Sequence, residues 1–199
     1  MVTGSFIGRR SERSDRLPPG QHDTGRSWPV LSYETTPKPD LASWTMTVDG
    51  LVEAVVSWTW DEIHGLPGST YSGDIHCVTT WSKFDTVFTG VSVDVLLGAA
   101  VPSPSAAFVM AHSSTGYTTN LPLADVTGGR AWVVWEFDGQ PLAPVHGGPA
   151  RLLVPHLYFW KSAKWISRLE LVEQDRPGFW EQRGYHDRGD PWQEERYQA

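Results

Sequence analysis

Residues 74–82, Asp-Ile-His-Cys-Val-Thr-Thr-Trp-Ser, contain the side chains of this 199-residue chain that are best suited to chemistry. Cys77 is the only cysteine, and it directly follows His76 and lies four residues before Trp81. A single thiol cannot form an intramolecular disulfide, so Cys77 is either an inert buried side chain or a reactive or metal-binding one. Residue type alone favours the buried side chain, and other motifs must decide.

Zinc is the first metal to consider, because Cys77, His76, His156 and His186 are all of zinc-ligand type. Spacings typical of zinc sites, such as Cys-x2-Cys or His-x3-His, do not occur in the chain. Zinc therefore remains the weaker alternative.

Composition and charge exclude several classes of function. The net charge of −7, without a basic stripe, argues against a nucleic-acid partner. No apolar run approaches ~20 residues, which excludes a membrane-spanning helix. Arg9-Arg10 is not followed by the apolar segment that a twin-arginine export signal requires. The single cysteine also rules out a disulfide framework, and the two observations together favour a cytoplasmic location. Eleven tryptophans suggest core packing or aromatic-lined cavities.

The elements that must position Cys77 are mostly short strands. We expect residues 1–16 to form a flexible polar tail and residues 17–199 a single domain. Capping-box spacing from Thr59 to Glu62 predicts a short helix, and residues 74–82 are expected to begin as a strand and end as a loop. Many short strands with few helices predict an irregular α+β domain. The expected strands are 44–48 and 51–57, joined by a turn at Asp49-Gly50, and then 107–111, 131–137, 151–154 and 164–172.

Several short motifs follow one another in a distinctive order. They are Trp44-x5-Gly50, His76-Cys77-Val78-x2-Trp81-Ser82, Gly90-Val91, Gly116-Tyr117-x3-Leu121-Pro122-Leu123, Gly139-x-Pro141-Leu142, His146-Gly147-Gly148-Pro149-x-Arg151, Val154-Pro155, Lys161-Ser162-x-Lys164-Trp165 and Gly178-Phe179-Trp180-Glu181-x2-Gly184-Tyr185-His186. Each motif is weak alone, but their joint order resembles the molybdopterin-binding domain of the sulfite oxidase superfamily. The resemblance runs from about residue 17 to the end, and it is closest to the small stand-alone bacterial members. It implies an irregular mixed-sheet fold, an oxidoreductase activity, and molybdenum held by the dithiolene of a single molybdopterin.

The resemblance implies that Cys77 is the protein ligand to molybdenum. A soft, deprotonated sulfur suits a metal that cycles by two electrons and exchanges an oxo group. Tyr117 matches a tyrosine near the metal, where a phenol donates a hydrogen bond or relays a proton. A buried tyrosine whose hydroxyl merely finds a partner is an equally good interpretation of Tyr117.

The resemblance also implies which residues bind the pterin and its phosphate. Arg151 and Lys164 match the phosphate-binding positions, where arginine offers a planar fork and lysine a point charge. Both lie beside apolar strands, where an unpaired charge is costly, and this favours binding over an ordinary surface role. For Ser113 a loop-capping role competes, and for His146 a satisfied loop histidine. The other implied contacts are Ser162 and Ala163 and, on the poorest match, Ser32 and Tyr33.

The chain departs from the sulfite oxidases and assimilatory nitrate reductases at two places. Those enzymes carry Arg-Asn-His before the first strand and Ala-Gly-Asn-Arg after the cysteine, whereas residues 30–34 and 78–81 here contain no arginine. Loss of both cations removes the best reason to propose sulfite or nitrate as substrate. The cysteine segment is more similar to that of the periplasmic molybdoenzyme that reduces methionine sulfoxides.

We therefore expect two-electron oxygen-atom transfer to or from a small molecule, such as reduction of an S- or N-oxide. A separate protein is expected to donate or accept the electrons. Two alternatives remain open: a non-catalytic molybdopterin-binding module, and oxidation of a small anion such as sulfite.

Overall fold

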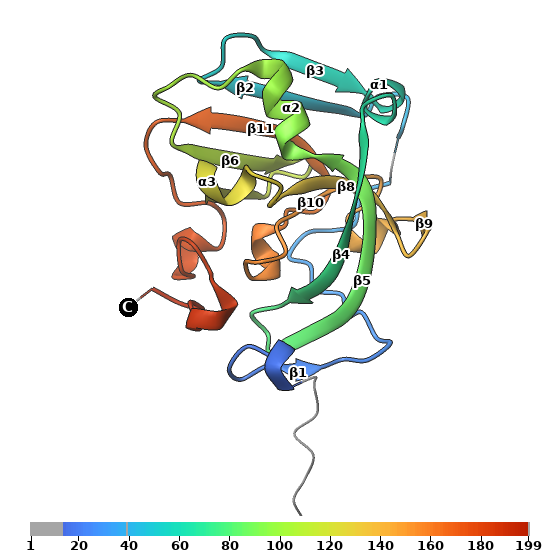
Figure 1. The fold of residues 1–199 in the computed structure, drawn as a ribbon, viewed down its shortest axis with the longest axis vertical. Coiled ribbons are helices and arrows are strands. Elements are labelled where there is room, and N and C mark those ends of the chain that lie inside the picture. Colours follow the sequence, from blue (N-terminus) through green and yellow to red (C-terminus); the bar gives the residue numbers. More distant parts are fainter. Residues whose placement is uncertain (1–13, 39, 199) are drawn as a thin grey trace, which may run out of the picture.

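Two mixed sheets and a few short helices make up the fold in a computed structural model that describes residues 14–38 and 40–198 (Figure 1). The first sheet has the order β1-β5-β8-β10, with β4 paired to β5 and β9 paired to β8. The second has the order β3-β2-β11-β6-β7. The pairs β1–β5 and β2–β11 are parallel and the others antiparallel. The expected α+β mixed-sheet class is confirmed.

The elements have the following bounds. The strands are β1 (His22–Asp23), β2 (Thr45–Gly50), β3 (Val56–Thr59), β4 (Gly68–His76), β5 (Trp81–Ser92), β6 (Phe108–Ser113), β7 (Thr118–Pro122), β8 (Trp132–Phe137), β9 (Gln140–Pro141), β10 (Arg151–Leu153) and β11 (Ile166–Val172). The α-helices are α1 (Trp60–His64), α2 (Val93–Ala100) and α3 (Leu123–Val126). The 3-10 helices are η1 (Ser14–Arg16), η2 (Pro144–His146), η3 (Phe159–Lys161), η4 (Glu181–Arg183) and η5 (Pro191–Gln193).

Apolar side chains from both sheets and from α2 form the main core. Met46, Leu96, Val109, Val133 and Leu169 are fully buried in this one cluster. A second apolar cluster contains Cys77 and lies where β4 ends and β5 begins. The first cluster packs the two sheets together, and the second packs apolar side chains against the end of β4.

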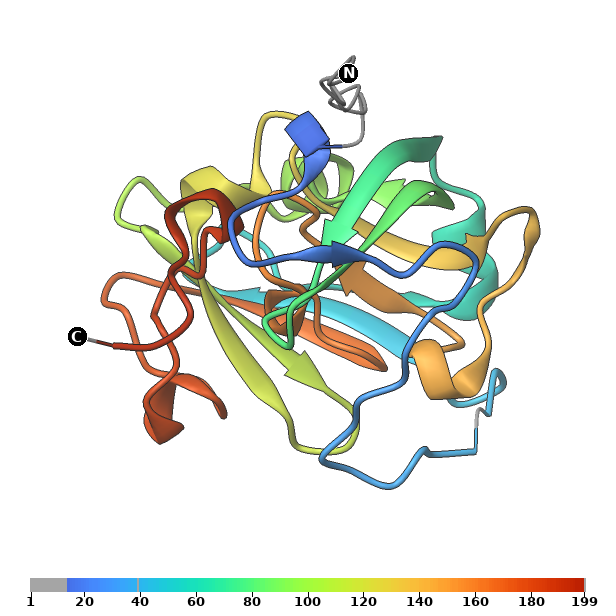
Figure 2. The ribbon, with the colours of Figure 1, turned by 90° about the horizontal axis from the view of Figure 1, so that it is seen from below.

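The N-terminal and C-terminal segments both lie on the surface of the two-sheet body (Figure 2). Figure 2 shows the N-terminal segment, in blue, crossing one face of the molecule, and the C-terminal segment, in red, at its side. Residues 1–13 of the expected tail lie outside the described residues. Ser14–Arg16 form η1, and the Arg16 guanidinium pairs with Asp74 and lies 4.5 Å from the centre of the Phe84 ring. Arg16, which the sequence assigned to the tail, therefore contacts the residues of the expected domain.

The turn expected at Asp49-Gly50 is wrong. Strand β2 runs through Gly50, which pairs with Leu171 of β11, and residues 51–55 then lead to β3. Gly50 has a φ of +84°, and a Cβ there would lie 2.3 Å from the Leu171 carbonyl oxygen. The glycine thus permits close approach of β11, a role that the same dipeptide does not reveal in sequence.

None of the helices in residues 14–38 and 40–198 is long and apolar enough to cross a membrane.

The predicted capping box is present at the start of α1. The Thr59 hydroxyl accepts the Glu62 backbone N–H, and the Glu62 carboxylate accepts the Thr59 backbone N–H at 2.8 Å. We expect Thr59→Ala to lower the free energy of unfolding by about 1 kcal/mol, because one helix N–H loses its acceptor. Urea denaturation measures the change, with Thr35→Ala in an exposed loop as the control. Equal stability of the two variants would contradict the capping role.

Candidate active site

A cavity of about 380 Å³ lies beside Cys77. Its walls come from the N-terminal segment (residues 28–34), the β4–β5 connection, the regions around η2, β10 and η3, and the C-terminal segment (residues 178–198). Every sequence-predicted site residue except Ser113 lines it. These residues are Ser32, Tyr33, Cys77, Tyr117, His146, Arg151, Ser162, Ala163 and Lys164.

Ser113 lies outside this lining. It is the last residue of β6 and is buried, and its hydroxyl accepts the Thr115 backbone N–H at 3.2 Å. The hydroxyl also lies 2.7 Å from the Thr115 Oγ1. Ser113 thus stabilises the turn after β6, which is the loop-capping role that the sequence left open.

A tight turn holds Cys77 at the cavity wall. Its backbone N–H donates to the Trp81 carbonyl at 2.8 Å, and its carbonyl accepts the Thr80 N–H at 3.0 Å. Thr80 has a φ of +74°, which reverses the chain between β4 and β5. Cys77 itself is buried in this turn, with only 8% of the residue exposed.

The surroundings of Cys77 favour the protonated form of its thiol. Burial raises the pKa of Cys77, and hydrogen bonding to the Thr79 hydroxyl, 3.2 Å from Sγ, offsets this rise only in part. A metal ion must therefore displace the thiol proton when it binds to the sulfur.

Arg151, the first residue of β10, is a fully buried cation without a carboxylate partner. Its Nη1 donates to the His146 carbonyl at 2.7 Å and its Nη2 to the Ser162 carbonyl at 2.6 Å. The guanidinium lies 3.9 Å from the centre of the Phe159 ring. Burial lowers the pKa of Arg151 to about 9, so the side chain is still charged at neutral pH. No ion pair in the described part of the chain includes it.

Lys164 is the second cation at the cavity, and within residues 14–38 and 40–198 its hydrogen bonds also go to carbonyl groups alone. Its Nζ donates to the Leu31 and Val145 carbonyls, both at 2.8 Å. Burial and the nearby Arg151 charge lower the pKa of Lys164 to about 8. Gly147, with a φ of +109°, lets these cations come together, since a Cβ there would lie 3.0 Å from the Arg151 Cβ and 3.1 Å from the Lys164 Cα.

These two cations indicate an anionic ligand. A buried charge without a counter-charge is costly, and the fully buried Lys161 has a carboxylate, from Glu181, at 2.6 Å. The buried Arg151 and the half-buried Lys164 have no carboxylate at ion-pair distance among the described residues, although both border an open volume. A phosphate group, as on a pterin cofactor, would supply the missing negative charge, so this donor set fits such a group.

His146 borders the cavity as a neutral ring. It stacks on Trp28 with ring centres 3.8 Å apart and planes 8° from parallel. Burial, followed by the charges of Arg151, Lys164 and Lys83, lowers the pKa of His146 to about 4. At neutral pH the ring therefore adds one hydrogen-bond donor and one acceptor to the wall, and no positive charge.

The low pKa of His146 predicts how stability changes with pH. An unfolded histidine takes up its proton near pH 6.5, whereas the folded one does so only near pH 4. We therefore expect the wild-type thermal midpoint to fall more steeply than that of His146→Gln as pH drops from 7 to 5. Thermal unfolding of cofactor-free protein measures both slopes, and parallel slopes would contradict the prediction.

Tyr117 donates its phenol hydrogen to the Trp160 carbonyl at 2.7 Å. Burial, and then the Glu181 charge, raises the pKa of Tyr117 well above its ordinary value, so the phenol stays protonated. This bond matches the structural interpretation of Tyr117, and its catalytic role stays a prediction.

Apart from Tyr33 and Tyr117, the aromatic residues of the cavity were not assigned to the site from the sequence. Trp28, Phe159, Trp160, Trp180 and Tyr185 all line it. The high tryptophan count signalled such a lining without locating it. The three histidines considered with Cys77 do not build a zinc site, because no group of three metal-ligand side chains occurs among the described residues.

Comparisons with known proteins give a family and several relatives for the chain. Residues 33–180 match the family model described as the oxidoreductase molybdopterin binding domain. The chain is 41% identical over 190 residues to the uncharacterized oxidoreductase YuiH of Bacillus subtilis, covering 95% of this chain and 96% of that protein. It is 29% identical over 147 residues to the putative protein-methionine-sulfoxide reductase subunit YedZ1 of Azospira oryzae, covering 74% of this chain and 56% of that protein.

Among solved structures, the sulfane dehydrogenase SoxCD of Paracoccus pantotrophus aligns with a TM-score of 0.64 at 20% identity. The alignment covers 70% of this chain and 40% of the SoxCD chain. At this identity the similarity establishes the fold alone, and that fold is the irregular mixed-sheet one expected from the motifs.

Proposed function

The chain belongs to the oxidoreductase molybdopterin binding domain family and is a molybdopterin-dependent oxidoreductase, and from this premise we propose that Cys77 binds the molybdenum. The observation that carries this proposal is the position of the only thiol on the same cavity as two cations that have no carboxylate partner in the described part of the chain. The sulfur and the cations match the two ends of the cofactor, one a metal and the other a phosphate.

The other lining residues take roles that follow from their contacts. Arg151 and Lys164 bind the phosphate, and the chain around Ser162 and Ala163 adds neutral donors. His146 contacts the pterin as an uncharged ring. Ser32 and Tyr33, on the N-terminal segment, complete the wall. When bound, the cofactor supplies the two-electron redox step and the exchange of an oxygen atom, while these residues bind and orient it.

We further propose that the substrate is a neutral S- or N-oxide that this enzyme reduces with electrons from a separate protein. Arg151 and Lys164 are both assigned to the phosphate, and His146 is uncharged at neutral pH. The described lining then offers no further cation for an anion such as sulfite, and Glu34 adds a carboxylate. The name of the YedZ1 relative, a putative protein-methionine-sulfoxide reductase subunit, supports an S-oxide.

Purification from a host that makes molybdopterin tests this proposal. We expect close to one molybdenum and one pterin per chain, and oxidation of a reduced viologen dye by methyl sulfoxides or amine N-oxides. Protein without molybdenum would overturn the assignment of the cavity. Bound cofactor without turnover would instead indicate a binding module, and turnover with sulfite and ferricyanide would indicate oxidation of a small anion.

A further inference from the structure

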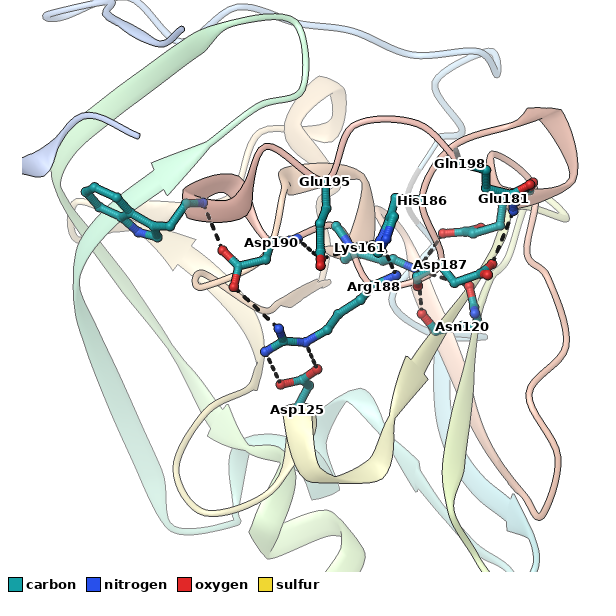
Figure 3. Close-up of polar contacts among 12 residues, drawn as sticks. Asn120, Asp125, Lys161, Glu181, His186, Asp187, Arg188, Asp190, Glu195 and Gln198 are labelled. Carbon is teal, nitrogen blue, oxygen red and sulfur yellow. Dashed lines mark hydrogen bonds and ion pairs between the residues drawn. The ribbon is translucent and has the colours of Figure 1, made fainter. Parts of the chain in front are cut away.

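The C-terminal segment, residues 178–198, forms one wall of the cavity. Trp180 and Tyr185 of this segment both line it. Two buried carboxylates attach the segment to the body of the protein: Glu181, which pairs with Lys161, and Asp125, which pairs with Arg188 (Figure 3). We propose that Glu181 is a positioning residue that fixes the cofactor-binding loop 162–164. This inference rests on the proposed function.

Glu181 joins the C-terminal segment to the residues immediately before that loop. Its Oε1 lies 2.6 Å from the Lys161 Nζ, and both side chains are 0% exposed. The same oxygen accepts the Trp160 indole N–H at 2.9 Å and the Thr119 hydroxyl at 3.0 Å. One carboxylate thus holds η3 and β7 together with the C-terminal segment.

Lys161 extends this junction, because its three N–H donors are shared with further oxygen atoms besides that of Glu181. Its Nζ donates to the Asn120 carbonyl at 2.8 Å, to the Asn120 Oδ1 at 3.0 Å, and to the Asp187 carbonyl (Figure 3). Lys161 therefore contacts the C-terminal segment at two points, through Glu181 and through Asp187. An ammonium group held by four oxygen atoms has little freedom to move.

The position of Lys161 is transmitted to the phosphate site by the next residue. The Ser162 carbonyl accepts the Arg151 guanidinium at 2.6 Å, and the Ser162 hydroxyl accepts the Val154 N–H at 2.9 Å. A shift of Lys161 would move this carbonyl and thus release one arm of Arg151. The same shift would also move Lys164, which lies two residues after Ser162.

Asp125 of α3 provides a matched control, because it binds Arg188 of the same C-terminal segment. Its carboxylate lies 3.0 Å from the Arg188 Nε, and Arg188 also pairs with Asp190 at 3.4 Å (Figure 3). Asp125 is 4% exposed, so its loss should also destabilise the fold. It does not line the cavity and touches neither η3 nor the loop 162–164 in the described contacts.

The experiment compares cofactor release from Glu181→Gln and Asp125→Asn. Each holoprotein is incubated at 37 °C and desalted at intervals, and the molybdenum-to-protein ratio is measured alongside the thermal midpoint. We expect Glu181→Gln to release molybdenum at least about 10-fold faster than wild type, and Asp125→Asn within about 2-fold of it, because only the former holds the loop. If Glu181→Gln does not fold, Glu181→Asp, which keeps the charge at shorter reach, is expected to release about 3-fold faster.

The positioning role would be overturned if both variants released molybdenum at rates explained by their loss in thermal midpoint alone. Release from Glu181→Asp at the wild-type rate would also overturn it. Wild-type protein without molybdenum would refute the proposed function itself. The two failures are therefore distinguishable.

Discussion

Serine at position 77 is expected to give a folded protein that contains no molybdenum and has lost activity by a factor of about 100 or more. Removing a residue that only orients a metal ligand typically costs 10- to 100-fold, and removal of the ligand itself should exceed this. A serine hydroxyl is a poor replacement, because it is a harder donor and stays protonated at neutral pH. Elemental analysis and dye-linked turnover of the purified variant measure both losses.

The fold of Cys77→Ser should survive, which makes the result interpretable. The new hydroxyl is close in size to the thiol and has a ready partner in the Thr79 hydroxyl, 3.2 Å from Sγ in the wild-type protein. We expect the free energy of unfolding of cofactor-free protein to change by about 1 kcal/mol or less. Thr79→Val, which keeps the sulfur, is the matched control and should retain molybdenum. Full molybdenum occupancy in Cys77→Ser would refute the ligand assignment.

The sequence located most of the candidate site because its residues sit in short motifs with fixed local geometry. His146 and Arg151 are bound to each other within a single stretch, through a carbonyl-to-guanidinium contact across five residues. Ser162, Ala163 and Lys164 are consecutive and reach the cavity together. Residues at such short spacings lie close together in the folded chain, because few backbone angles separate their side chains.

Residues that reach the site through long-range packing were not predictable in this way. Trp28 lies 118 positions before His146 and yet stacks directly on it, and nothing in the local sequence of either residue records the contact. The Lys161–Glu181 pair joins two motifs that were recognised separately. The strand β5 (Trp81–Ser92) was not anticipated either, because its first four residues are all buried although Ser82 and Lys83 among them are polar, and alternation begins only at Phe84. Such features depend on which segments meet, and pattern alone does not specify this.

Ser113 shows a different case, in which a motif position was matched but the side chain has a local partner. Its hydroxyl contacts Thr115, two residues later. Serine side chains compete in this way for nearby backbone groups wherever a turn follows. A match in spacing therefore places the residue near the site without determining where its hydroxyl points.

Replacing Arg151 by methionine is expected to remove the cofactor while changing the stability of the cofactor-free protein only slightly. Each charge-assisted hydrogen bond to phosphate contributes about 1.5–3 kcal/mol, so losing the planar fork should weaken cofactor binding by about 100-fold or more. Molybdenum and pterin content of the purified variant, relative to wild type, measures this loss.

The small effect on the cofactor-free protein follows from opposing contributions. Methionine leaves the His146 and Ser162 carbonyls without their donor, at a cost of about 1–3 kcal/mol each. It also removes a buried charge that has no carboxylate partner, and that charge costs several kcal/mol to bury. Because these effects offset each other, we expect the free energy of unfolding to change by about 2 kcal/mol or less.

Lys161→Met is the matched control for this prediction, because Lys161 is equally buried but does have a counter-charge. Its loss leaves the Glu181 carboxylate buried and unpaired, so we expect a destabilisation of about 3–5 kcal/mol. Urea denaturation of both cofactor-free variants provides the comparison. If Arg151→Met is as unstable as Lys161→Met, then the Arg151 charge already contributes to folding without a ligand, and the argument that it is held there for a phosphate fails.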